Sequence, residues 1–273
     1  MILKKSAFVV ACVLSFSFAK AQKLEKLWET DTILKVPECV VLNAQKNMLY
    51  VSNIGSPTMA DGFGSIGKIG TDGKVISVDW VTGLNAPKGM ALVGNELFVA
   101  EPKAVAIIDV KAGKLIARIP VEDAKMLNDV DAAPNGDVYV SDSRGGKIIK
   151  VSNRKVSTVV DGLEGPNGVL FAKGKLHFLD RGRLFVMEGN DKKLLAEGME
   201  ASTDGVEQLA NGDFLVSCWS GVIYYVKANG ITTILLDTRE QKMNTADITW
   251  DGDKKIMYVP TFFKNKVVAY RLL

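Results

Sequence analysis

Short apolar runs with strand-like alternation recur along the whole chain, and one of them appears six times in a common form. Aliphatic and aromatic residues dominate the first three positions of each copy, and a small or polar residue follows, as in LYVSN and VYVSD. The copies are residues 49–53, 97–101, 138–142, 176–180, 214–218 and 257–261. Their starts are 48, 41, 38, 38 and 43 residues apart. This spacing is typical of the blades of a β-propeller.

Each copy is the second of four strands in its repeat. Another apolar run precedes it: residues 40–42, 89–93, 130–133, 168–172, 205–209 and 248–250. Third and fourth strands follow, as at 147–151 and 156–160, with Asn-Gly, Asp-Gly and Gly-Lys turns between strands. No amphipathic helix of three turns or more is expected. We therefore predict an all-β, six-bladed β-propeller with four antiparallel strands per blade. A β-sandwich has strands of similar length but does not require one pattern six times.

The two ends of the chain predict how the ring closes. The last repeat stops after a third strand, at residues 267–273, while residues 26–29 precede the first repeat where a fourth strand belongs. The N-terminal strand is expected to complete the last blade and remove an open sheet edge. We predict one propeller domain over residues 22–273.

Residues 1–21 have the features of a signal peptide. Lys4 and Lys5 form a basic start, residues 6–18 form an apolar stretch too short to span a bilayer, and Ala-Lys-Ala ends at Ala21. The sequence predicts export, to the periplasm or as a secreted protein, with cleavage near Ala21. Cleavage before Cys12, as in a lipoprotein, is the alternative, but it would leave a very short apolar stretch. No later segment is apolar enough to be transmembrane.

Charge and composition exclude several functions. The chain has 273 residues, 47% of them hydrophobic, and a formal net charge of +3. Residues 1–21 contain three lysines and no acid, so the remaining chain is close to neutral. Without a basic patch we expect no nucleic-acid partner. A single histidine excludes multi-histidine zinc sites. The expected partner is a small-molecule substrate, and the expected state is a monomer.

The turns that lead into the six predicted inner strands carry the candidate chemistry. In a propeller these strands surround the central channel, so their first residues converge on its mouth. At matching positions the turns carry Glu38, Lys88, Asn128, Asn167 and Asp204, and Ala246 or Asp247 in the sixth blade. Two carboxylates and two amides supply four hard oxygen ligands, which suit a divalent cation. Asn-Gly and Asp-Gly are also common turn dipeptides, but Glu38 and Asn128 have no glycine after them.

On these residues the chain resembles the senescence-marker-protein/gluconolactonase (regucalcin-like) family of six-bladed propellers, relatives of the calcium-dependent phosphotriesterase and paraoxonase propellers. The resemblance covers the mature chain. It implies that Glu38, Asn128, Asn167 and Asp204 are the ligands of one metal ion, foremost calcium, with magnesium, manganese or zinc as alternatives. Met126 stands where sugar-lactonase members have an arginine for the substrate. The resemblance thus implies the metal more directly than the substrate.

Two functions from different classes follow. The first is an exported metal-dependent hydrolase of a lactone or similar small ester, in which Asp204 activates the attacking water and Lys88 stabilises developing negative charge. The second is a non-enzymatic propeller that binds a peptide, a glycan or a small molecule, with the polar ring serving only as turn chemistry.

Other conspicuous residues have plainer interpretations. Residues 62–67 match a dinucleotide-binding glycine pattern, but Ile66 to Ile69 alternates like a strand, so no nucleotide is expected. This pattern begins in a long loop, 54–65, which is expected over the channel mouth. His177 occupies a strand position and is expected to pack between blades. Cys39 and Cys218 fall in non-neighbouring blades, so a disulfide is not expected. Three acids, Glu101, Asp142 and Asp180, are expected to accept hydrogen bonds from turn amides.

Overall fold

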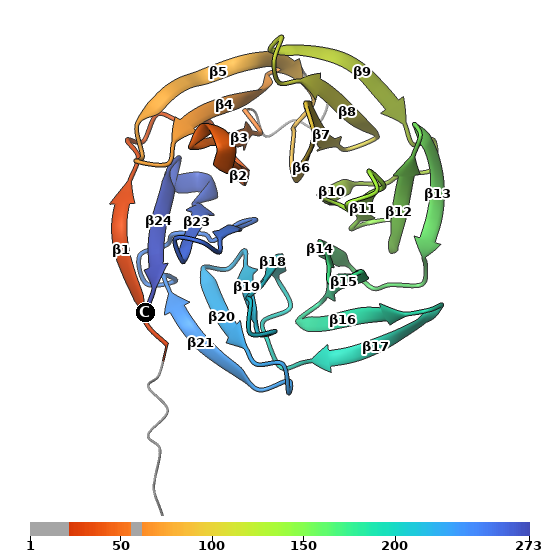
Figure 1. The fold of residues 1–273 in the computed structure, drawn as a ribbon, viewed down its shortest axis with the longest axis vertical. Helices are drawn as coiled ribbons and strands as arrows, with labels where there is room; N and C mark the ends of the chain where they lie inside the picture. The colour runs from red at the N-terminus through yellow and green to blue at the C-terminus, as the bar shows by residue number, and fades with distance from the viewer. Residues whose placement is uncertain (1–21, 56–61) are drawn as a thin grey trace, which may run out of the picture.

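Six four-stranded antiparallel sheets surround a central axis in the computed structural model, which describes residues 22–55 and 62–273 (Figure 1). Blade one contains β2 (Pro37–Asn43), β3 (Met48–Asn53), β4 (Gly64–Gly70) and β5 (Val75–Leu84). Blade two contains β6 (Met90–Val93), β7 (Glu96–Glu101), β8 (Ala104–Asp109) and β9 (Lys114–Pro120). Blade three contains β10 (Leu127–Ala132), β11 (Val138–Asp142), β12 (Lys147–Ser152) and β13 (Lys155–Val160). The predicted all-β six-bladed propeller is confirmed.

The second half of the ring repeats this arrangement. Blade four contains β14 (Pro166–Ala172), β15 (Lys175–Asp180), β16 (Arg183–Glu188) and β17 (Asp191–Ala196). Blade five contains β18 (Thr203–Gln208), β19 (Phe214–Cys218), β20 (Val222–Val226) and β21 (Thr232–Asp237). Blade six contains β22 (Thr249–Asp251), β23 (Ile256–Pro260), β24 (Val267–Leu272) and β1 (Leu24–Glu29). In Figure 1 the fourth strands lie at the rim, and the first strands of blades one to five lie nearest the axis.

Blade six is closed by the two ends of the chain, as predicted. Strand β1 pairs antiparallel with β24, from Leu24 opposite Leu272 to Glu29 opposite Val268. A bulge between Lys26 and Trp28 interrupts this register once. Because the N-terminal strand covers the outer edge of β24, the ring is held by backbone hydrogen bonds between the first and last parts of the fold.

The core lies between the blades rather than within one sheet. All five residues of β19 and all five of β20 are buried, whereas the fourth strand β9 alternates between exposed positions and partly or fully buried ones. Second and third strands are covered by neighbouring blades on both faces, which is why their sequences are nearly continuous apolar runs. One cluster joins Ile148 of blade three to Phe178 and Phe185 of blade four, whose rings stack 5.3 Å apart.

Helical structure in the described ranges is confined to two short 3₁₀ turns, η1 (Ala44–Lys46) and η2 (Phe262–Lys264). A search of the described residues finds no helix with the length and apolar character needed to cross a membrane. The predicted signal peptide, residues 1–21, and residues 56–61 of the predicted loop 54–65 lie outside the described residues.

Candidate functional site

The predicted site residues of blades one to five line a single cavity at one mouth of the channel. The cavity has a volume of about 520 Å³, which is within the usual range of small-molecule sites. Its lining includes Glu38, Lys88, Asn128, Asn167 and Asp204. The side chains come from five different blades because each inner strand begins at this end of the ring. The structure therefore brings together all five residues that the sequence placed at matching turns.

Glu38 lies near the start of β2 with only 4% of its surface exposed. Its Oε1 is 3.4 Å from the Nζ of Lys88, and its Oε2 is buried without a hydrogen-bond partner. Burial raises the pKa of Glu38, and the charge of Lys88 opposes that rise. A buried carboxylate oxygen without a partner is costly unless a cation or donor satisfies it.

Asn167 and Asp204 form a second pair across neighbouring blades. The Nδ2 of Asn167 donates to Oδ1 of Asp204 at 2.9 Å, and Oδ1 of Asn167 is buried without a partner. Asn128 donates its Nδ2 to Oγ of Ser143 at 3.1 Å. Both amides thus use their N–H groups within the protein, which leaves carbonyl oxygens as acceptors. Burial, followed by the negative charge of Glu38, raises the pKa of Asp204 well above its ordinary value.

The donor set fits a hard divalent cation. Two carboxylates and two amide side chains line one cavity, and two oxygens of the set are buried and unpaired. The described residues contain no cluster of three or more His, Cys, Asp or Glu arranged as metal ligands, and the proposed set contains only two such residues. The sixth blade does not complete this ring: Ala246 is fully buried, and Asp247 lines the channel below the site.

A second layer of acids lies deeper in the channel. Asp129 of β10 accepts from the N–H of Val169 at 2.7 Å, and burial raises its pKa to about 7, although this hydrogen bond counteracts the rise. Burial and the negative charge of Asp129 likewise raise the pKa of Asp247 well above its ordinary value. The sequence pattern indicates Asp247 only as an alternative and does not indicate Asp129, although each of these acids lies one residue after the matching turn position of its blade.

The packing of Asp247 explains why residue 205 is a glycine. A Cβ on Gly205 would lie 2.4 Å from Oδ1 of Asp247 and 2.6 Å from the backbone nitrogen of Ile248. Only glycine leaves room there for the carboxyl group of the next blade. The Asp-Gly dipeptide at residues 204–205 is therefore a packing requirement as well as a strand start.

The opposite mouth of the channel carries two further acids that the sequence analysis did not identify. Asp131 accepts from the N–H of Phe171 at 2.6 Å, and Glu207 accepts from the N–H of Trp250 at 3.0 Å. Both line a cavity of about 260 Å³. Burial raises the pKa of Asp131 to about 6 and that of Glu207 to about 8, and the charge of Asp131 adds to the latter. Asp131 lies two residues after Asp129, and Glu207 lies two residues after Gly205, the equivalent position in blade five. Strand alternation from these positions was the signal that could have placed both acids in the channel.

The structure agrees with the expectations for His177, for the two cysteines and for the strand at residues 66–69. His177 is buried and packs against Phe214 of the next blade, with ring centroids 5.4 Å apart. Cys39 and Cys218 are both free and buried. Residues 64–70 form strand β4, not a phosphate-binding turn before a helix.

The three acids at the ends of second strands accept backbone hydrogen bonds. Asp142 accepts from the N–H groups of Lys125, Met126 and Gly145. Glu101 accepts from that of Asn85, and Asp180 from that of Gly165.

Comparison with solved structures identifies the class of fold. A gluconolactonase from Xanthomonas campestris superposes with a TM-score of 0.68 at 15% identity, over 92% of this chain and 89% of that one. A luciferin-regenerating enzyme gives 0.64 at 14% identity, over 92% and 95% of the two chains. Virginiamycin B lyase from Staphylococcus aureus gives 0.66 at 12% identity, over 93% and 100%.

These neighbours agree with the family that the strand-start residues resemble. At such low identity they establish the shared propeller fold and leave the reaction open. The sequence matches no model of a known protein family, and no curated protein has a similar sequence.

Proposed function

We propose that this protein is an exported, metal-dependent hydrolase of lactones or similar small esters. The observation that carries the proposal is the pair of buried, unpaired oxygens, Glu38 Oε2 and Asn167 Oδ1, in a cavity also lined by Asn128 and Asp204. Such oxygens favour a bound cation over an empty turn cluster. Export rests on the composition of residues 1–21 alone.

In this proposal the ion would be held by Glu38, Asn128, Asn167 and Asp204. A bound divalent cation would supply Lewis-acid polarisation of the substrate carbonyl. Asp204 is the residue that accepts a proton from the attacking water, because its carboxylate lies in the cavity beside the other proposed ligands. Asn167 orients Asp204 through the 2.9 Å hydrogen bond. Lys88 provides a positive charge at the cavity wall for a developing oxyanion.

The structural neighbours include two reaction types. Gluconolactonases support a hydrolase, and virginiamycin B lyase supports a lyase. That lyase structure is of a catalytically inactive variant in which a histidine is replaced by alanine. The single histidine of this chain, His177, is buried between blades and is not part of the cavity lining. The hydrolase therefore fits this site better than the lyase.

The test is hydrolysis of aldonolactones, simple γ- and δ-lactones and aryl esters, with calcium, magnesium, manganese or zinc and with chelator. Asp204→Asn is expected to retain much of the metal binding, since an amide oxygen still coordinates, and to lose about 10² to 10⁴-fold in kcat. Glu38→Gln is expected to weaken metal binding first. Activity that survives both substitutions would place the reaction elsewhere. A bound metal without turnover of any substrate would favour the non-enzymatic binding propeller.

A further inference from the structure

Three aromatic rings stand together at the rim of the candidate site. Trp219 follows β19 in blade five, and Phe262 and Phe263 lie in η2 of blade six. The centroids of Trp219 and Phe262 are 5.5 Å apart, those of Trp219 and Phe263 are 5.9 Å apart, and those of the two phenylalanines are 4.8 Å apart. Trp219 and Phe262 line the same cavity as Glu38 and Asp204. We call these three residues the aromatic rim.

The aromatic rim remains open to solvent although its rings are large and apolar. Trp219 is 39% exposed and Phe263 is 63% exposed. Exposed aromatic surface beside a polar cavity is unfavourable in the free protein and becomes favourable when an apolar group covers it. Met126 and Ala201 add further apolar surface to the cavity wall.

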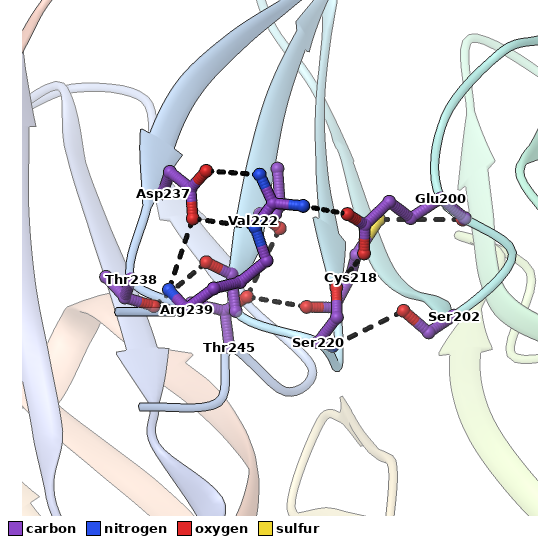
Figure 2. A network of polar contacts seen from close by, with 10 residues as sticks. Glu200, Ser202, Cys218, Ser220, Val222, Asp237, Thr238, Arg239 and Thr245 are labelled. Atoms are coloured by element: carbon purple, nitrogen blue, oxygen red, sulfur yellow. Dashed lines mark hydrogen bonds and ion pairs between the residues drawn. The ribbon is translucent and has the colours of Figure 1, made fainter. Parts of the chain in front are cut away.

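Polar contacts hold Cys218 and Ser220, the residues before and after Trp219 in the sequence (Figure 2). Ser220, the next residue, donates its Oγ to Glu200 and its N–H to Oγ of Ser202. Thr245 donates to the carbonyl of Cys218, the preceding residue, at 2.8 Å. Arg239 pairs with both Glu200 and Asp237. The residues on both sides of Trp219 are thus tied to neighbouring loops.

The backbones of Trp219 and Phe262 are also held. The N–H of Trp219 donates to the carbonyl of Ser202 at 2.8 Å, and Asn244 donates to the carbonyl of Trp219 at 2.8 Å. Phe262 has a φ of 49°, a left-handed conformation that is strained for a bulky residue. Such strain persists where the surroundings determine the conformation, and it is frequent at ligand-binding sites. A preorganised aromatic surface loses little entropy when a ligand binds.

We propose that the aromatic rim binds an apolar, ring-bearing substituent of the substrate, so that the site selects aryl-substituted lactones over small or polyhydroxylated ones. The proposal rests on the function proposed above and adds the substrate class. One cavity contains both parts of such a site. Its oxygen ligands and Lys88 would face the reacting carbonyl, and Trp219 and Phe262 would contact the substituent. Rings of the substituent would meet the rim in edge-to-face or offset contacts.

The binding test uses stable lactams, so that it does not depend on turnover. Calorimetric titration of the full chain with 5-phenylpyrrolidin-2-one and with pyrrolidin-2-one, in calcium, gives the ratio of the two Kd values. The wild-type protein is expected to bind the phenyl lactam about tenfold or more tightly, the scale of discrimination that one apolar pocket provides. Phe263→Ala and Trp219→Ala are expected to bring the ratio toward one. Trp219→Phe is expected to keep most of it, which separates loss of the ring from loss of the fold.

Ile76→Ala is the matched control, because Ile76 is an exposed apolar residue, 56% exposed, on the outer strand β5. It is expected to keep the ratio. The same variants are then compared in the ratio of kcat/KM for γ-phenyl-γ-butyrolactone to that for γ-butyrolactone. If the protein binds the phenyl lactam more tightly but hydrolyses neither lactone, the proposed hydrolase function is wrong and the aromatic rim stands as a binding surface. If the protein hydrolyses the lactones but binds the two lactams equally, the aromatic rim does not bind the substituent. The same conclusion would follow if the ratio of the two Kd values were unchanged in Phe263→Ala and Trp219→Ala.

Discussion

Glu207 at the far mouth of the channel provides a sharp test of the electrostatics of this propeller. Its side chain lines the smaller cavity, accepts a hydrogen bond from the N–H of Trp250, and lies near the charge of Asp131. Burial raises its pKa from the ordinary value of 4.5 to about 8. The folded protein therefore favours the protonated form, and ionisation of Glu207 costs stability.

The sign and the size follow from this pKa. A carboxyl group whose pKa is higher in the folded than in the unfolded state makes no unfavourable contribution below pH 4.5 and destabilises increasingly as the pH rises to about 8. The full difference corresponds to an upper limit of about 5 kcal/mol. Because solvent enters the channel mouth and screens the charge, we expect about 2 to 3 kcal/mol.

Glu207→Gln removes the ionisation and keeps an oxygen that can accept from Trp250. At pH 9 the variant should be more stable than the wild type, with a Tm higher by about 5 to 10 °C for a chain of this size. At pH 5 the two proteins should differ by less than about 1 kcal/mol. Thermal unfolding followed by circular dichroism at both pH values, with denaturant titrations for the free energy, measures the difference.

Glu122→Gln, the same substitution at an exposed residue, is the control for the loss of one negative charge from the surface. A Glu207→Gln variant that is equally stable or less stable than the wild type at pH 9 would refute the reasoning. The same would follow from a gain of equal size at pH 5 and pH 9, because that gain could not come from ionisation.

Three further predictions concern the ring and the channel. Millimolar calcium should raise the Tm of the wild type, because the proposed ligands join blades one, three, four and five, and chelator should reverse the rise. Scanning fluorimetry measures the shift, which should be smaller in Glu38→Gln. Lys88→Met should make the calcium affinity depend more steeply on pH, because Lys88 lowers the pKa of Glu38 and its removal leaves a proton that the ion must displace. Calorimetry in buffers of different ionisation enthalpy would detect that proton, and an unchanged pH dependence would argue against the pairing. Gly205→Ala should lower the free energy of unfolding by about 1 to 3 kcal/mol in urea titrations, because its Cβ would meet Asp247. Gly136→Ala is the comparison: Gly136 has a positive φ and open space around it, so this variant tests backbone strain without a clash.

The repeat and its alternation were sufficient to predict the architecture. Second and third strands are buried on both faces, so each blade needs the same apolar run, and six runs at blade spacing predict six blades. The missing fourth strand at the C-terminus and the spare strand at the N-terminus predicted the closure, which β1 and β24 form. Glu38, Lys88, Asn128, Asn167 and Asp204 could be grouped because equivalent positions in a closed ring must meet at one mouth.

Other features were decided only by packing between segments far apart in the chain. No sequence pattern predicts that the rings of Trp219 and Phe262 meet. They follow different strands in different blades, and neither belongs to the repeated strand pattern. It also does not show that Lys88 lies 3.4 Å from Glu38, or that Asp129 and Asp247 share the channel. Local pattern determines the strand and its register, because alternation and turn chemistry act over a few residues. Side-chain distances and pKa values depend on how the six blades close around the axis, and only the tertiary structure sets them.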